Sequence, residues 1–138
     1  MAGTRRRARI AALKVLYELD CTKHDAEEAL ARLTLQPGMP EAALDFSGEL
    51  VRGVLQHKDE LDALIRKLAP AFPAEQMSAI DRNVLRLAIF EILFGHKAPF
   101  KVAINEAIEL AKEFGSDSSA RLVNGVLGAM TAEGGADH

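Results

Sequence analysis

The chain has 138 residues, of which 49% are hydrophobic and 27% are charged, values ordinary for one globular domain with a sizeable core. No apolar run approaches the ~20 residues of a membrane-spanning helix, and charged residues interrupt the pattern after the N-terminal arginines, which argues against a secretory signal. The single cysteine, Cys21, excludes an internal disulfide, and we expect it to be a small buried residue at a helix end. These features predict a cytoplasmic protein without membrane contact.

Positive charge is concentrated at the N-terminus. The first 17 residues carry +5 and no acid, whereas the whole chain has 17 basic and 20 acidic residues, a net charge of −3. Residues 18–138 therefore hold 12 basic and 20 acidic residues, a net charge of −8. A cationic arm on an anionic body suggests a polyanionic partner, because the planar guanidinium of arginine suits phosphate oxygens and guanine edges. A solubilising tail is the alternative explanation of the cluster alone.

The hydrophobic pattern is helical along the whole chain and predicts about seven helices. The first covers roughly residues 5–20. Arg5 and Arg9 are four apart, and Arg6 and Arg9 are three apart, so each pair would share a face if the helix extends back to them. A basic helix face can follow a phosphate backbone or enter a distorted RNA groove.

Capping signals and prolines delimit the next helices. Residues 25–28 have the spacing of a capping box and open a second helix, which ends at the turn Pro37–Pro40. Third and fourth helices are expected on either side of residues 57–59. The prolines of segment 70–73 then break the chain.

Ser78 and Asp81 form a second capping signature. They start the most apolar helix, which we place at the centre of the core because hydrophobic side chains cover most of its circumference. A sixth helix begins near Pro99 and ends at Gly115, expected to be a left-handed C-cap. The serines of segment 116–119 would cap a seventh helix.

These elements predict an all-α fold, a single compact bundle of about seven helices in two subbundles. Segment 70–73 would divide the two halves, but neither half could bury its apolar faces alone, so residues 1–138 are expected to form one domain. Residues 1–9 would be the basic arm and residues 131–138 a frayed tail.

No pattern of catalytic or metal-binding residues stands out. The glycines are dispersed, the four histidines lack metal-ligand spacing, and carboxylate pairs such as Glu109 and Glu113 fall on predicted exposed faces. Aromatic residues make up 5% of the chain, with no tryptophan, so a stacking platform for bases is not expected. The sequence favours binding over catalysis, without cofactor or metal.

Four sequence motifs are recognisable. The most specific is P-F-K-V-A-I-N-E-A-I-E-L-A-K over residues 99–112, followed by R-L-V-N-G-V-L over residues 121–127. A-L-K-V-L-Y over residues 12–17, after the arginine cluster, and D-R-N-V-L-R-L-A over residues 81–88 complete the set. With these motifs the chain resembles the NusB family of bacterial transcription antitermination factors over nearly its whole length, and the N-terminal cluster looks like the family's arginine-rich motif.

The resemblance implies an all-helical, non-enzymatic protein that pairs with the ribosomal protein that doubles as NusE. The heterodimer would bind the single-stranded boxA element of nascent ribosomal RNA leaders and join the antitermination complex on RNA polymerase. The net charge of −8 on the body is a physical reason to expect a basic protein partner.

Positions that match the family's motifs give two candidate sets. The RNA-binding candidates are Arg5, Arg6, Arg7, Arg9, Lys101, Asn105, Ser118, Ser119 and Arg121. The candidates for the protein partner are Tyr17, Asp81, Arg82 and Arg86. For the candidates on the sixth and seventh helices, a capping or bridging role within the fold is the alternative.

Two positions depart from the family pattern. Members often carry an acid where this chain has Ser118, and an aromatic residue where it has Leu122. The missing acid removes a repulsion towards phosphate, and the missing aromatic residue removes a possible stacking surface for a base.

Two other hypotheses stay open. Helical domains resembling NusB form the N-terminal part of some rRNA cytosine methyltransferases, and this chain, which has no methyl-donor domain, would then be a fragment. The chain could also form a homodimer in which the RNA or partner surface is masked.

Overall fold

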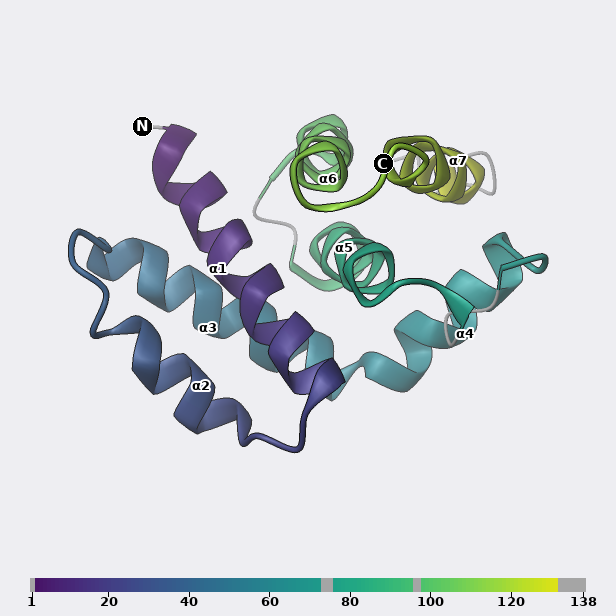
Figure 1. Ribbon diagram of the computed structural model, residues 1–138. Coiled ribbons are helices and arrows are strands. Elements are labelled where there is room, and N and C mark those ends of the chain that lie inside the picture. Colours follow the sequence, from purple (N-terminus) through teal and green to yellow (C-terminus); the bar gives the residue numbers. More distant parts are fainter. Residues whose placement is uncertain (1, 73–75, 96–97, 132–138) are drawn as a thin grey trace.

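The computed structural model describes residues 2–72, 76–95 and 98–131, and no strand occurs within these ranges. The helices are α1 (Ala2–Cys21), α2 (Ala26–Leu33), α3 (Glu41–Gln56), α4 (Lys58–Leu68), α5 (Ala79–Phe90), α6 (Phe100–Phe114) and α7 (Ser119–Met130) (Figure 1). A π-helical turn, Glu91–Gly95, directly follows α5. The predicted all-α fold is confirmed. None of the helices in the described ranges is long and apolar enough to cross a membrane.

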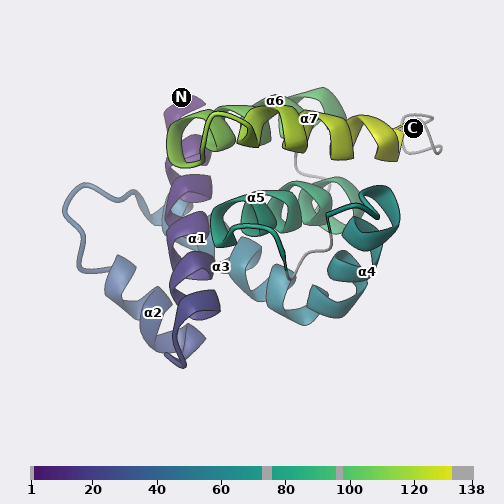
Figure 2. The same ribbon diagram turned by 45° about the vertical axis from the view of Figure 1, so that its right-hand side comes forward.

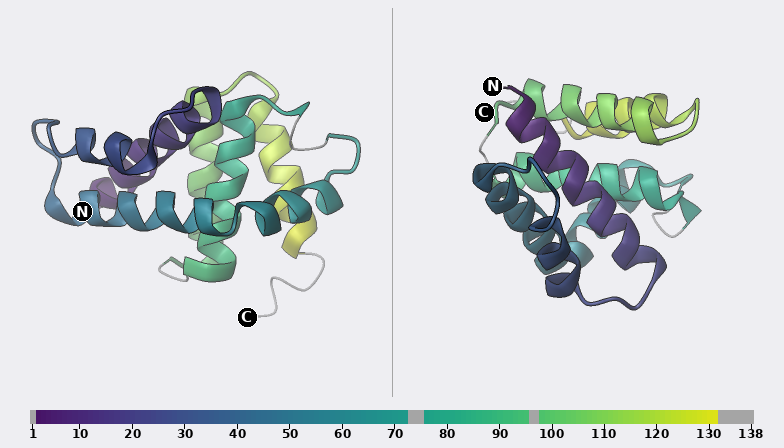
Figure 3. Two further views of the ribbon diagram at one scale, coloured as in Figure 1. Left: turned by 90° about the horizontal axis from the view of Figure 1, so that it is seen from below. Right: turned by 60° about the vertical axis from the view of Figure 1, so that its left-hand side comes forward.

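Helix α5 lies at the centre of the molecule. It contacts α1, α3, α4, α6 and α7, and its side chains Val84, Leu85 and Ile89 are completely buried. Figure 2 shows α6 and α7 above α5, with α1 running past the ends of these helices. Seen from below, α3 and α4 follow one another across α5 (Figure 3, left). The predicted central position of the most apolar helix is confirmed.

Two predicted N-caps are present. The Asp25 carboxylate accepts a hydrogen bond of 3.0 Å from the backbone N–H of Glu28, and the Ser78 hydroxyl accepts one of 3.1 Å from the N–H of Asp81. Each satisfies a backbone donor that a helix start leaves unpaired, and is worth ~1 kcal/mol. These caps fix where α2 and α5 begin.

The end of α6 differs from the prediction. Gly115 has φ −97° and ψ −166°, an extended conformation in place of the expected left-handed cap. Glycine is needed there for space: a Cβ atom would lie 2.6 Å from the Cβ of Ser119 and 2.7 Å from the carbonyl oxygen of Ala111. The close approach of α7 to the end of α6 therefore explains this residue.

The end of α1 also differs, because Cys21 is exposed and not buried as expected. The buried face of α1 includes Leu13 and Leu16. Because four residues make slightly more than one turn, each step of four along the helix moves the side chain nearer to the edge of this face. Tyr17 is already 44% exposed, and Cys21 lies one turn beyond it at the last position of the helix. Of the predicted tail, only Thr131 lies within the described residues.

Candidate nucleic-acid interface

The N-terminal arginines lie on a formed helix, because α1 begins at Ala2. The helix therefore extends back to all four arginines, so Arg5 and Arg6 each share a helix face with Arg9. The four arginines differ in their main contacts, although Arg5 and Arg9 both lie over the Phe46 ring. These contacts decide which guanidinium groups a ligand can reach.

Arg9 is buried. Its Nε and Nη2 atoms donate hydrogen bonds of 2.8 Å each to the two carboxylate oxygens of Glu91, in the π-helical turn. The Arg9 side chain is 4% exposed, and its guanidinium lies 5.5 Å from the centre of the Phe46 ring. An enclosed, paired guanidinium has no access to a phosphate in this conformation. We therefore assign Arg9 to holding α1 in place, instead of the expected contact with RNA.

Arg6 forms a two-pronged ion pair with Glu106 on α6. Its Nε atom donates to Glu106 Oε1 at 3.0 Å, and its Nη2 atom donates to Oε2 at 2.6 Å. The hydrogen bond from Arg6 holds the pKa of the Glu106 carboxyl below its ordinary value, and the same bond raises the pKa of Arg6. Unlike Arg9, the Arg6 side chain is half exposed.

Arg5 and Arg7 extend along other sides of the same helix. The Arg5 guanidinium lies 5.4 Å from the centre of the Phe46 ring on α3, a cation–π arrangement. Arg7 Nη2 donates a hydrogen bond of 2.7 Å to the carbonyl oxygen of Gly38, a glycine whose φ of +80° turns the chain between α2 and α3. Both arginines are exposed, so each keeps a solvent-facing charge while it is held in position.

A hollow of about 410 Å³ separates the start of α1 from the start of α6. Guanidinium groups line one side, and exposed Pro99 and Val102 with the Glu106 carboxylate line the other. Single-stranded nucleic acid presents phosphates together with unstacked bases, so it is recognised by cations next to apolar surface. This hollow offers both.

The two candidates on α6 lie on a neighbouring face of that helix. Lys101 and Asn105 are exposed and one turn apart, next to the face that carries Val102 and Glu106. Lys101 also lines a groove of about 520 Å³ between α6 and α7, to which Asn124 contributes. Lys101 and Asn105 thus lie on the same helix as Val102 and Glu106, the α6 residues that line the hollow beside the arginine arm.

The candidates on α7 divide into two kinds. Ser118 and Arg121 are exposed. Ser119 is 1% exposed, and its hydroxyl accepts a hydrogen bond of 2.8 Å from the backbone N–H of Ser116. Its hydroxyl therefore stabilises the turn between α6 and α7, which differs from the expected contact with RNA. Leu122 is half-buried and packs against the core.

The four candidates for a protein partner lie around the end of α1 and the start of α5. Tyr17 is exposed, and Arg82 is partly exposed with its Nε atom donating to Asp20 Oδ2 at 2.8 Å. Arg86 is buried and donates hydrogen bonds of 2.7 and 2.8 Å to Asp62 on α4. Its guanidinium thus joins α5 to α4 and does not face outward.

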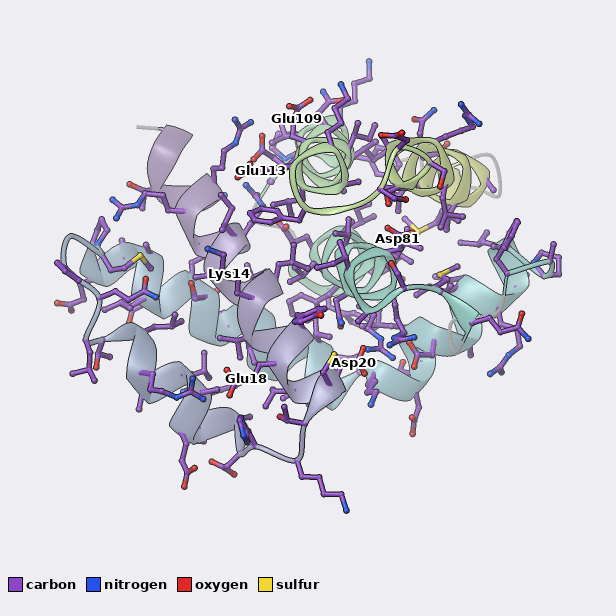
Figure 4. All side chains as sticks on the ribbon, viewed as in Figure 1. Lys14, Glu18, Asp20, Asp81, Glu109 and Glu113 are labelled. Carbon is purple, nitrogen blue, oxygen red and sulfur yellow. The ribbon has the colours of Figure 1, made fainter. Side chains whose placement is uncertain are left out.

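Asp20 and Asp81 are two of the carboxylates at this end of the molecule (Figure 4). Burial raises the pKa of Asp20, but hydrogen bonds from Arg82 and Asn83 and the nearby charge of Arg86 lower it more, so its pKa lies below the ordinary value. Asp81 is 8% exposed, and no hydrogen-bond partner among the described residues reaches its Oδ1 atom. Tyr17 and Arg82 are therefore the two candidates that offer surface to a partner.

Comparison with known proteins identifies the family. The sequence profile of the NusB family matches residues 6–132. The chain belongs to the NusB family. The profile includes the arginine cluster from Arg6 onward and both of the helices that flank the hollow.

Named NusB proteins are similar to the chain over nearly their whole length. The transcription antitermination protein NusB of Dehalococcoides mccartyi (strain CBDB1) is 52% identical over 131 residues, covering 95% of this chain and 92% of that protein. The protein of the same name from Chloroflexus aggregans is 49% identical over 133 residues, covering 94% of this chain and 88% of that protein.

Solved NusB structures share the fold. T. maritima NusB superimposes with a TM-score of 0.86 at 35% identity, covering 94% of this chain and 91% of that one. A chain from a crystal structure of the antitermination factors NusB and NusE in complex with double-stranded RNA gives a TM-score of 0.82 at 24% identity, covering 96% and 99%. At that identity the second likeness concerns the fold alone.

Three residues that hold the arginine arm in this NusB-family chain were not predicted from its sequence. They are Phe46, Glu91 and Glu106, on three different elements. Glu106 lies within the most specific motif, but nothing in the motif indicates that its carboxylate faces an arginine 100 positions earlier. Only the packing of α6 beside α1 shows this.

Proposed function

We propose that this chain is a non-enzymatic transcription antitermination factor that acts as an RNA-binding adaptor. Together with the ribosomal protein NusE it binds boxA RNA of ribosomal RNA leaders, and the complex joins the antitermination machinery on RNA polymerase. The observation that carries the proposal is that the exposed arginines Arg5 and Arg6 line a hollow together with Pro99 and Val102, while exposed Arg7 adds a further cation on the same helix. The names of the relatives support the same function.

In this proposal single-stranded RNA follows the surface from the start of α1 across α6 to the start of α7. Arg5, Arg6 and Arg7 contact phosphates at one end, and Lys101 with Asn105 continues the path on α6. Ser118 and Arg121 extend it at the positive end of α7, where backbone N–H groups favour an anion. Each phosphate contact releases counterions, so the affinity falls steeply with salt.

The protein partner binds at the opposite end of α1. Tyr17 offers an exposed aromatic ring, the residue type that commonly anchors protein interfaces. Arg82 contacts the partner at the edge of the polar cluster, and the buried Asp81 and Arg86 fix the helices that carry this surface. Because the two surfaces involve different ends of α1, RNA and NusE can bind at the same time.

Fluorescence anisotropy with labelled boxA RNA and a scrambled RNA, with and without NusE, tests the function. We expect a preference for boxA that NusE strengthens and that weakens as salt is raised. Equal, salt-sensitive binding of both RNAs in every arm of the experiment would contradict the boxA proposal and leave a nonspecific cationic arm.

A matched pair of variants tests the arm itself. Replacing Arg5, Arg6 and Arg7 with alanine removes three cations from α1, and replacing Lys58, Arg66 and Lys67 removes three exposed cations from α4 on the other side of the molecule. We expect a loss of about tenfold or more in affinity for the first variant and a much smaller loss for the second. Equal losses would mean that net charge alone drives binding.

The homodimer hypothesis is tested in the same preparation. Light scattering at several protein concentrations, with and without RNA, measures whether a homodimer forms and whether it masks the RNA surface.

The relatives described above are named antitermination proteins, so the hypothesis of a methyltransferase fragment receives no support from them.

A further inference from the structure

Helix α6 carries acidic residues on the side that faces the arginine arm. Glu106, Glu109 and Glu113 follow one another at helical spacing, and Figure 4 shows Glu109 and Glu113 on the side of α6 towards α1. The pKa of Arg6 is raised first by its hydrogen bond to Glu106, and more weakly by the charges of Glu109 and Glu113. A segment suited to bind a polyanion therefore lies against carboxylates of its own chain.

The contact between Arg6 and Glu106 uses the part of the guanidinium that a phosphate would use. The Nε and Nη2 atoms form the fork that binds two oxygens of one anion side by side, and both point to the two oxygens of Glu106. A phosphate cannot form the same pair of hydrogen bonds while the carboxylate occupies this fork.

Glu106 is held more firmly than Arg6. Its side chain is 17% exposed, against 51% for Arg6, and a second guanidinium, that of Arg9, lies 3.7 Å from its Oε1 atom. Arg9 is in turn fixed by Glu91. The carboxylate thus has a fixed position at the edge of the hollow, and Arg6 is the partner that can move outward.

We infer that Glu106 restrains the arginine arm by holding Arg6 in an internal ion pair that an RNA phosphate must displace. The inference rests on the proposed RNA-binding function of the arm. Its consequence is a lower affinity for RNA of any sequence, because the electrostatic contribution to binding does not depend on sequence. Tight binding then requires the additional contacts that a matching RNA or a protein partner supplies.

The variant Glu106→Gln tests this, since glutamine has nearly the same size without the charge. We expect the affinity for both boxA and scrambled RNA to rise about three- to tenfold. We also expect the slope of log affinity against log salt to steepen by up to about 0.7, the value for one phosphate contact with a single strand, because the phosphate no longer has to displace a carboxylate from Arg6. Glu113→Gln, which removes the same charge two turns further along α6, is the control and should change the affinity by less than about twofold.

Replacement of Arg6 gives an independent measurement that does not depend on the stability of the Glu106 variant. In the wild-type chain, Arg6→Ala should lower RNA affinity by less than it does in the Glu106→Gln chain, because the phosphate contact that is lost first had to displace the ion pair with Glu106. In the Glu106→Gln chain the same replacement should abolish the gain. A loss for Arg6→Ala that is as large in the wild-type chain as in the Glu106→Gln chain would overturn the inference.

The remaining outcomes separate this inference from the proposed function. An unchanged or lower affinity of a folded Glu106→Gln protein, or no binding of either RNA to any variant, overturns the inference. A wild-type protein without preference for boxA overturns the proposed function, but a rise in affinity for both RNAs on Glu106→Gln would still support the restraint. Thermal unfolding of each variant establishes that the compared proteins are folded.

Discussion

Arg9 and Glu91, 82 positions apart in the chain, form a buried ion pair through two hydrogen bonds of 2.8 Å. Their side chains are 4% and 5% exposed. The pair joins α1 to the π-helical turn after α5, and so fixes the direction in which the arginine arm leaves the body. Both charges are compensated only as long as both partners are present.

Removing one partner should therefore destabilise the fold strongly. We expect Arg9→Met to lower the free energy of unfolding by ~3–5 kcal/mol, because the Glu91 carboxylate would stay buried without its partner. Urea unfolding followed by circular dichroism measures this. The double variant Arg9→Met/Glu91→Leu leaves no buried charge and should recover most of the loss. A single variant that loses less than ~1 kcal/mol would contradict the assignment of Arg9 to the fold.

Gly53 allows α3 to pack directly on the ring of Phe90. A Cβ atom at position 53 would overlap that ring, which has no flexible end to move aside. We expect Gly53→Ala to cost ~1–3 kcal/mol in the free energy of unfolding, as overpacking does elsewhere. Gly125→Ala is the control: this helical glycine is exposed with open space around it, and the change should stabilise the protein by ~0.5–1 kcal/mol. Two changes of the same sign would refute the packing explanation.

Neighbouring serines at the start of α7 should respond differently to alanine. Ser119→Ala removes the acceptor for the backbone N–H of Ser116, so we expect a loss of ~1 kcal/mol in unfolding free energy with unchanged RNA affinity. Ser118→Ala alters an exposed hydroxyl and should leave the stability nearly unchanged while lowering RNA affinity slightly. Thermal unfolding and anisotropy on both variants measure this. Reduced RNA affinity of a fully stable Ser119→Ala protein would show that its hydroxyl contacts RNA.

Glu18 makes the stability of the junction between α1 and α2 sensitive to acid. Its carboxylate accepts hydrogen bonds from Arg32 and, at 2.6 Å, from His24, which lower its pKa from the ordinary 4.5 to about 2. Because the folded-state pKa is depressed, the stabilisation is fully present above pH 4.5 and is lost as the pH falls towards 2. Glu18→Gln should lower the melting temperature at pH 7 and reduce the further decrease between pH 5 and pH 2.5.

Arg32→Gln removes the same interaction from the other side and is the matched control for the acid experiment. It should reduce the dependence on pH only in part, because His24 still contacts Glu18, and the double variant should behave like Glu18→Gln. Melting curves of the four proteins across this pH range test the prediction. A wild-type dependence on pH retained in Glu18→Gln would assign the acid sensitivity to other carboxylates.

Local features of the fold could be predicted from the sequence because their causes are local. The caps at Asp25 and Ser78 require a side chain and a backbone N–H three residues later, a spacing visible in the sequence. The central position of α5 follows from apolar residues around most of its circumference. The all-α class and the starts of α2 and α5 therefore agree with the predictions, whereas α1 begins earlier and α2 ends earlier than predicted.

The roles of individual arginines could not be predicted in this way. Arg6, Arg7 and Arg9 look equivalent in the sequence, but they contact a carboxylate on α6, the backbone carbonyl of Gly38 and a buried carboxylate after α5. Which arginine is buried depends on the helices that lie beside each face of α1, and these come from distant segments. The same holds for Ser119, whose burial depends on the approach of α7 to Gly115.

The helical start of α1 has a thermodynamic consequence. Fixing the backbone of one flexible residue costs ~1–2 kcal/mol, so an arm that folded only on binding would lose that much affinity per ordered residue. Residues 2–9 of this chain already lie within α1, and contacts with other parts of the fold hold their arginines. The conformational entropy of the arm is thus lost when the protein folds and not when it meets a ligand. Association with this surface should proceed without a folding step, with little change in helical content and at a rate set by diffusion and charge.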